Sequence, residues 1–261
     1  MLDKVTAPAV VRMRAKGEVI VCVTAYDAIL GSLADRSGAD IVLVGDSVGN
    51  TVLGYTSTIP VTQEMMIYHT QAVRRGVNRA LLVADLPFGS YQASVQDAVA
   101  NSVALVKAGA ESVKLEGAYV EAIREISRAG IPVMGHVGMT PQSVNAFGGF
   151  RVQGKGAKGQ DVIDEAKRVQ DAGAYAIVLE LIPSELARRI TEELEVPTIG
   201  IGGGAHCSGQ VQVIYDLLGF GSGEFKHTKR YFNGNEVILD ALHNYCCEVK
   251  AGTFPTEENS F

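Results

Sequence analysis

The sequence predicts an α/β protein whose strands and helices form a single (β/α)₈ TIM barrel. Short apolar runs alternate with helical segments along the chain, as in a parallel sheet covered by helices. The runs are rich in Val, Ile and Leu without alternating polar residues, which indicates strands that are buried on both faces. The length of 261 residues is typical of one such barrel. A doubly wound open sheet is the alternative that these observations leave.

The predicted strands are short and β-branched. Seven are distinct, and the eighth strand that would close a barrel is expected near residues 220–231, where the pattern is weaker. The seven segments are residues 19–27, 40–46, 80–85, 112–117, 132–137, 176–181 and 197–204.

Helical segments fill the intervals between the strands. Three of them end on Ala-Gly, at residues 108–109, 129–130 and 172–173, and a glycine just past the last turn commonly stops a helix. The segments are residues 28–38, 62–76, 94–110, 119–130, 161–173 and 183–195.

The organisation of the chain indicates one domain over residues 1–261. No linker or low-complexity segment interrupts the alternation. A short helix is expected near the N-terminus. The last residues, about 251–261, are expected to be mobile or to dock on a neighbouring subunit.

The composition excludes several classes of protein. The net charge is −6, so the chain lacks the basic field that nucleic-acid binding requires. No apolar run approaches the ~18 residues of a membrane span, and the N-terminus lacks the apolar segment of a signal peptide. The four cysteines fit neither a disulfide framework nor a zinc site. We therefore expect a cytoplasmic protein that acts on small molecules, with no nucleic-acid or membrane partner.

Polar side chains recur where the predicted strands end. In a barrel these ends meet at one mouth, which holds the active site; in an open sheet they would line one crevice. Either fold therefore predicts a single site. Its candidate residues are Asp46, Ser47, Asp85, Lys114, Glu116, His136 and Glu180.

Each candidate has an ordinary structural explanation when taken alone. A strand-end Asp or Ser can cap a helix, Lys114 and Glu116 can form an ion pair, and His136 can be a hydrogen-bonded core residue. Together, however, several carboxylates in one low-dielectric mouth repel each other unless positive charge lies among them. Lys114 supplies one charge, and a hard divalent cation such as Mg²⁺ or Mn²⁺ would supply the rest. The pattern therefore predicts a metal site.

The glycines of residues 200–205 allow another interpretation. Gly200, Gly202 and Ala205 fit the G-x-G-x-x-A fingerprint of dinucleotide sites, which would indicate a nicotinamide-dependent oxidoreductase. A glycine-rich loop is equally expected after the seventh strand of a barrel. We prefer the barrel loop because no distinct βαβ unit with a ribose-binding acid follows.

Long blocks of sequence between about Val23 and Leu218 match those of one known protein family in the same order. They include "DIVLVGDSVGNTVLGYTSTIPVT", "VADLPFGSY", "VKLEG", "GIPVMGHVGMTPQSVNAFGGFRVQGK" and "IVLELIP". These blocks resemble the ketopantoate hydroxymethyltransferase family. The chain departs from the family pattern at Thr56, where members commonly carry Asp, and at Ser208, where they often carry Asp.

The resemblance implies a (β/α)₈ barrel of the phosphoenolpyruvate/pyruvate superfamily. It implies transfer of a hydroxymethyl group from 5,10-methylenetetrahydrofolate, a co-substrate, to 3-methyl-2-oxobutanoate. The product is 2-dehydropantoate, on the route to pantothenate and coenzyme A. The resemblance also implies one Mg²⁺ per subunit and a homo-oligomer, expected to be a decamer.

Roles for the site residues follow from the resemblance, position by position. Asp46, Asp85 and Glu116 look like the Mg²⁺ ligands. Lys114 and Ser47 look like contacts to the ketoacid, which also meets Asp46 and Asp85 at the metal. Glu180 looks like the base, and Lys114 and His136 belong with it to the catalytic group.

Two other functions remain open at this point. A metal-dependent lyase or mutase of the same superfamily would share the metal and the ketoacid contacts but would act on another 2-oxo acid without folate. A non-catalytic barrel would predict loss of the site residues, whereas all of the candidates are present.

Overall fold

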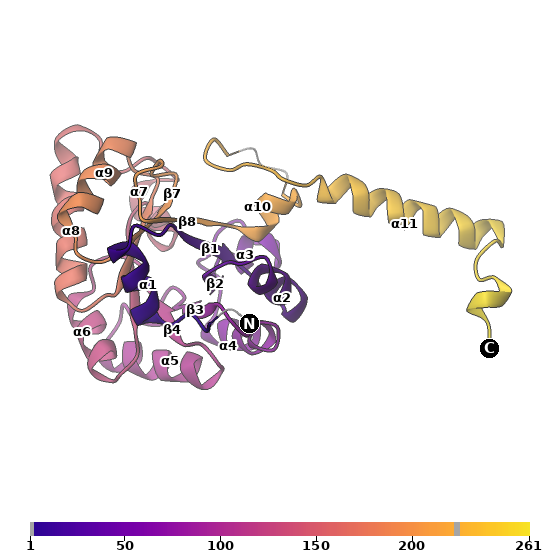
Figure 1. Ribbon diagram of the computed structural model, residues 1–261, viewed down its shortest axis with the longest axis horizontal. Helices are drawn as coiled ribbons and strands as arrows, with labels where there is room; N and C mark the ends of the chain where they lie inside the picture. The colour runs from indigo at the N-terminus through magenta and orange to yellow at the C-terminus, as the bar shows by residue number, and fades with distance from the viewer. Residues whose placement is uncertain (1–2, 222–224) are drawn as a thin grey trace. The chain divides into compact units, whose positions relative to one another are not determined.

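Eight parallel strands form a closed barrel in the order β1 to β8 (Figure 1). Each strand pairs with its neighbours in the sequence, and β8 pairs back with β1. The strands are β1 (Ile20–Thr24), β2 (Ile41–Val44), β3 (Leu81–Asp85), β4 (Ser112–Lys114), β5 (Val133–Gly138), β6 (Ala176–Glu180), β7 (Thr198–Ile201) and β8 (Gly209–Gln212). The predicted barrel is confirmed, and the open sheet is excluded.

This is a computed structural model, and it describes residues 3–221 and 225–261. The chain divides into two compact units, Met1–Val213 and Ile214–Phe261. The first unit contains the whole barrel. The expectation that residues 1–261 form one domain stays a prediction.

Helices of the first unit lie around the ring of strands in Figure 1, whereas α1 lies across one end of it. The helices of this unit are α1 (Ala7–Ala15), α2 (Ala28–Arg36), α3 (Val48–Thr51), α4 (Gln63–Arg74), α5 (Val95–Lys107), α6 (Val120–Arg128), α7 (Val144–Phe147), α8 (Gly159–Asp171) and α9 (Ser184–Glu193), with the 3-10 turns η1 (Pro141–Ser143) and η2 (Gly156–Lys158). Three helices stop where the Ala-Gly pairs predict, because Gly109, Gly130 and Gly173 adopt positive φ just beyond α5, α6 and α8.

The short helix expected near the N-terminus is α1. Val5, Ala7 and Val10 are buried and belong to the same apolar cluster as strand residues such as Ile20 and Ile41 at the start of β1 and β2. This packing places α1 at the N-terminal end of the barrel. α1 therefore does not cover the opposite end of the barrel, where the strands finish and the predicted site residues lie.

The predicted position of the eighth strand is wrong. Among the described residues of 220–231 there is no strand, and β8 lies instead at Gly209–Gln212. The sequence Gly-Gln-Val-Gln has little strand character, so its hydrogen bonds to β1 and β7 decide its conformation. Gly209 is required there because a Cβ would collide with the backbone oxygen of Ile20.

The second unit contains α10 (Ile214–Leu218), α11 (Gly234–Ala251) and the 3-10 turn η3 (Glu257–Asn259). No helix was predicted over α11, which has 18 residues. It ends at Ala251 and is followed by Gly252, which adopts φ 70°. Mobility or docking of the tail from about residue 251 stays a prediction. Among the described residues, no helix combines the length and the apolar character that crossing a bilayer requires.

Candidate active site

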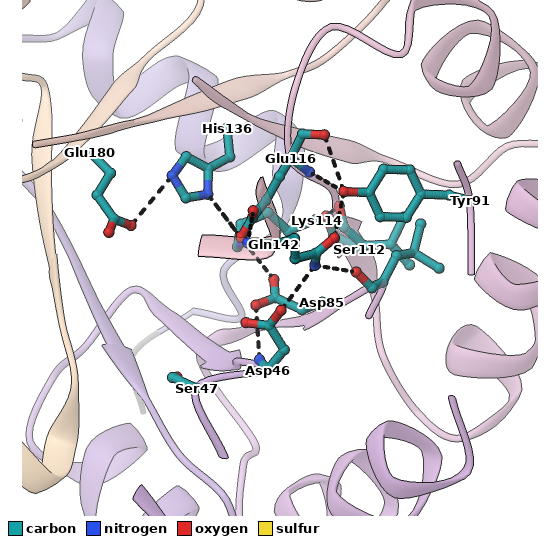
Figure 2. A network of polar contacts seen from close by, with 12 residues as sticks. Asp46, Ser47, Asp85, Tyr91, Ser112, Lys114, Glu116, His136, Gln142 and Glu180 are labelled. Carbon is teal, nitrogen blue, oxygen red and sulfur yellow. Dashed lines mark hydrogen bonds and ion pairs between the residues drawn. The ribbon is translucent and has the colours of Figure 1, made fainter. Parts of the chain in front are cut away.

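The polar strand-end residues converge at one mouth of the barrel (Figure 2). Asp85, Lys114 and Glu180 are the last residues of β3, β4 and β6, and His136 lies within β5. Asp46 and Glu116 follow the ends of β2 and β4 by two residues. The five from Asp46 to His136 are almost fully buried, at 2–4% exposure. The structure thus brings together residues that are far apart in the sequence.

Lys114 is the cation at the centre of this group. Its Nζ lies 2.9 Å from Oδ1 of Asp85, because the two residues are paired across β3 and β4. Burial alone would lower the pKa of Lys114, but the carboxylates of Asp85, Glu116 and Asp46 raise it above its ordinary value. The ammonium group therefore stays charged throughout the physiological range.

Asp46 and Asp85 meet at the ends of adjacent strands. The backbone N–H of Asp46 donates to Oδ2 of Asp85 at 3.0 Å. Burial, and then the charge of Asp85, raise the pKa of Asp46 to about 7. Burial and Asp46 likewise raise the pKa of Glu116 well above its usual range. One ammonium group therefore does not neutralise the three carboxyl groups.

His136 links the lysine to the sixth strand. Its Nδ1 lies 3.4 Å from Nζ of Lys114, and its Nε2 lies 3.4 Å from Oε2 of Glu180. Because an ammonium group can only donate, Nδ1 is the acceptor, and the ring proton sits on Nε2, facing Glu180. Burial and the charge of Lys114 lower the pKa of His136, so the ring is neutral.

Glu180 is the most accessible acid of the group, with 16% of its side chain exposed. In Figure 2 it lies on the far side of the His136 ring from Lys114 and Glu116. The ring lies between Glu180 and Lys114, although the charge of Glu180 still contributes to the raised pKa of Asp46 and of Glu116. Glu180 is therefore free to approach a substrate atom at the mouth.

Ser47 lies beside Asp46 at the edge of the network in Figure 2. It precedes α3 but makes no side-chain capping bond, so the capping explanation fails. Its Oγ lies 2.8 Å from the hydroxyl of the buried Tyr26, which accepts a hydrogen bond from Thr24. The Ser47 hydroxyl is thereby oriented at the mouth.

Two further residues of the network, Gln142 and Tyr91, were not anticipated. Gln142, in η1, donates its side-chain Nε2 to Oδ2 of Asp46 and its backbone N–H to Oε2 of Glu116, both at 2.9 Å. Tyr91 follows β3, and its hydroxyl lies 2.7 Å from Oε1 of Gln142. Neither residue ends a strand, and neither carries a charge. The strand-end pattern could therefore not find them.

The side chains of the site can be assessed as ligands for the predicted divalent cation. Its oxygen donors and its excess of buried negative charge suit Mg²⁺. Among the described residues, no three His, Cys, Asp or Glu side chains are arranged as a metal site. The backbone N–H of Asp46 contacts the Asp85 carboxylate, whereas Glu116 is linked to Asp46 through Gln142. The chemistry of the residues fits the cation.

The glycine-rich stretch after β7 does not form a dinucleotide site. β7 ends at Ile201, and the next element is β8 from Gly209, so no helix follows the strand. The fingerprint of Gly200, Gly202 and Ala205 requires a helix N-terminus at that point. The barrel-loop interpretation is confirmed.

Sequence comparison finds a matching family model and relatives of high identity. The ketopantoate hydroxymethyltransferase family model matches residues 4–257. A 3-methyl-2-oxobutanoate hydroxymethyltransferase of Moorella thermoacetica is 54% identical over 264 residues, covering 99% of this chain and 98% of that protein. The protein of the same name from Syntrophus aciditrophicus is 51% identical over 263 residues, covering 99% and 97%.

Solved structures with the same fold are more distant in sequence. A phosphonopyruvate hydrolase aligns with a TM-score of 0.63 at 12% identity, covering 97% of this chain and 93% of that one. A 2,3-dimethylmalate lyase of the PEP mutase/isocitrate lyase superfamily aligns with a TM-score of 0.62 at 14% identity, covering 100% and 92%. At such identities the likeness shows the fold alone.

Proposed function

The chain belongs to the ketopantoate hydroxymethyltransferase family, and from this premise we propose how its barrel mouth performs the reaction. The chain transfers a hydroxymethyl group from 5,10-methylenetetrahydrofolate to 3-methyl-2-oxobutanoate. Water is consumed, and the products are 2-dehydropantoate and tetrahydrofolate. The reaction is a step towards pantothenate. Folate is a co-substrate, so the transfer needs no bound redox group.

Asp46, Asp85 and Glu116 would hold one Mg²⁺ per subunit. The observation that supports this is the surplus of buried carboxylates over the single ammonium group of Lys114. When bound, the cation supplies Lewis-acid stabilisation of the negative charge that develops on the keto oxygen. Asp46 and Asp85 thereby also contribute to ketoacid binding.

Lys114 and Ser47 would bind the anionic end of the ketoacid. Lys114 carries a charge that its neighbours maintain, and the hydroxyl of Ser47 is oriented by Tyr26. A fixed ammonium and a fixed hydroxyl at one mouth suit a carboxylate. This grip would place C3 of the substrate toward the sixth strand.

Glu180 would remove the proton from C3 and leave an enolate. Its carboxylate lies outside the acidic cluster, and the N–H at Nε2 of His136 faces its Oε2. His136 would orient the base and share its hydrogen bond as the proton arrives. Water cleaves both C–N bonds of the folate methylene bridge, which releases formaldehyde and leaves tetrahydrofolate. The enolate carbon then adds to the formaldehyde carbonyl and becomes quaternary, and the proton that Glu180 removed protonates the new hydroxymethyl oxygen.

The single observation that carries the mechanism is the separation of Glu180 from the Lys114-centred cluster by one neutral imidazole. Hydrogen–deuterium exchange at C3 of 3-methyl-2-oxobutanoate tests it. We expect exchange in D₂O with Mg²⁺, loss of exchange with EDTA, and about 10²–10⁴-fold slower exchange in Glu180→Gln. NMR measures the exchange, and circular dichroism verifies the fold of the variant.

The same assay separates the transferase from a superfamily lyase or mutase. Adding methylenetetrahydrofolate should convert the enolate into 2-dehydropantoate. If exchange stays absent both without folate and with tetrahydrofolate present, the assigned substrate and base are wrong. Cleavage of another 2-oxo acid without folate would then favour the lyase or mutase.

The chain is further proposed to act in the cytoplasm as a homo-oligomer, expected to be a decamer, without nucleic-acid or membrane partners. All four of its cysteines are free, which suits a reducing compartment. The stripe of Ile238, Leu242, Tyr245 and Val249 along α11 is 45–57% exposed. Such an apolar face supports burial against another subunit.

A further inference from the structure

Gln142 contacts the residues that follow β2, β3 and β4, although it lies in none of these strands. Its side chain is 4% exposed. The amide Nε2 donates to Oδ2 of Asp46 and to the backbone oxygen of Leu86, both at 2.9 Å. These contacts fasten the β5 loop to the residues that follow β2 and β3.

The carbonyl oxygen of the Gln142 side chain also has hydrogen-bond partners. Oε1 of Gln142 lies 2.7 Å from the hydroxyl of Tyr91 and 3.0 Å from Nε2 of Gln92, which donates to it. The reverse orientation of the amide would set two NH₂ groups against each other and an oxygen against a carboxylate. The partners therefore fix the amide in one orientation.

The backbone of the same residue holds a second acid. The N–H of Gln142 donates to Oε2 of Glu116 at 2.9 Å. The hydroxyl of Tyr91, which contacts the Gln142 side chain, also accepts the backbone N–H of Glu116 at 3.1 Å. Gln142 thus donates hydrogen bonds to one oxygen of Asp46 and one oxygen of Glu116, which are 96 and 26 positions away in the sequence.

We propose that Gln142 is a positioning residue that holds Asp46 and Glu116 in fixed orientations, so that the remaining oxygen of each is presented to the divalent cation. The inference rests on the metal-dependent function proposed above. A hydrogen-bonded partner that orients a carboxylate ligand typically contributes 10–100-fold to metal affinity. A residue that merely fills the core would contribute to folding alone.

The test measures binding of Mn²⁺ alone, without substrate, by isothermal titration and by the EPR signal of free Mn²⁺. Gln142→Met keeps the length of the side chain and removes its hydrogen bond to Asp46, while the backbone N–H still donates to Glu116. This variant should bind Mn²⁺ about 10–100-fold more weakly than the wild type at pH 8. Activity of Gln142→Met should return towards the wild-type value as Mg²⁺ is raised, which a general folding defect would not allow.

Gln170→Met is the matched control. The Oε1 of Gln170 accepts the backbone N–H groups of Glu195 and Val196, ahead of β7 at the opposite end of the barrel. The same chemical change there should leave the Kd for Mn²⁺ unchanged. Asp46→Asn serves as the reference for loss of a ligand.

The outcomes separate this inference from the proposed function. A folded Gln142→Met variant whose Kd for Mn²⁺ stays within twofold of the wild type overturns the positioning role, while wild-type exchange at C3 would still support the reaction. Weaker Mn²⁺ binding in Gln142→Met supports the positioning role even if the wild type gives no exchange. A wild-type chain that binds no Mn²⁺ overturns the positioning role outright.

Discussion

Asp46 is the residue at which the electrostatic conflict of the site is greatest. Its carboxyl group is buried beside Asp85, and these two causes raise its pKa to about 7. The ordinary pKa of 3.8 applies in the unfolded chain. A carboxyl group whose pKa is higher in the folded state contributes stability that is full below about pH 4 and is lost as the pH rises through about 7.

Asp46→Asn should therefore stabilise the metal-free protein, and more so at high pH. Asn imitates the protonated carboxyl group and removes the penalty of ionising it. Between pH 5.5 and pH 8 the gain in unfolding free energy over the wild type should grow by on the order of 2 kcal/mol. Urea unfolding in EDTA at several pH values measures it.

The comparison between the two proteins reports Asp46 together with its charge interaction with Glu116, whose pKa Asp46 also raises. The lowered pKa of His136 makes stability fall towards acid pH, and this contribution is common to both proteins to first order. Asp171→Asn, at an exposed position of α8, is the control for the same chemical change outside the site. A pH-independent gain in Asp46→Asn would contradict the raised pKa.

At the scale of elements, closure of the barrel depends on β8 and on how closely it approaches β1. Gly209 is paired with Ile20, and a Cβ at Gly209 would meet the backbone of that residue. Backbone atoms cannot give way as a flexible side chain can. Pairing of β1 with β8, the strand with the weakest sequence pattern, therefore requires a residue without a Cβ at position 209.

Gly209→Ala should lower the unfolding free energy by at least about 1–3 kcal/mol, because the added methyl group forces β1 and β8 apart. Thermal and urea unfolding measure the loss. Gly203→Ala, in the loop between β7 and β8, is the control: its Cβ would meet Leu179, Ala187 and Cys207 only at 3.4–3.8 Å. That change should stay within about 0.5 kcal/mol. Equal effects in the two variants would argue against the contact of Gly209 with β1.

At the scale of the whole molecule, the proposed association of subunits can be tested on α11. Its apolar residues Ile238, Leu242, Tyr245 and Val249 recur at intervals of three and four positions, so they form one stripe along the helix. They are 45–57% exposed. Water-exposed stripes of this kind are stabilised when another apolar surface covers them.

Leu242→Glu should shift the proposed oligomer to smaller species, because it places a charge in the middle of the stripe. Size-exclusion chromatography with light scattering measures the mass. Asn244→Glu adds the same charge to the opposite side of α11 and should leave the mass unchanged. If Leu242→Glu also keeps the wild-type mass, the stripe does not hold the subunits together.

The sequence by itself determined the α/β class with a parallel sheet, seven of the strands, the six helices predicted between them and the group of polar strand-end residues. These features are local, since a buried parallel strand must be apolar on both faces and its last residue must face the mouth. The candidate residues Asp46, Asp85, Lys114, Glu116 and His136 therefore lie in one network, as expected.

Only the tertiary structure decided the position of β8, the long helix α11 and the contacts of Gln142. β8 has weak intrinsic preference and is a strand because β1 and β7 supply its hydrogen bonds. Gln142 is neutral and lies in a loop, and its partners Asp46 and Glu116 are 96 and 26 positions away. Local pattern carries no information about such partners, because they meet only when the barrel closes.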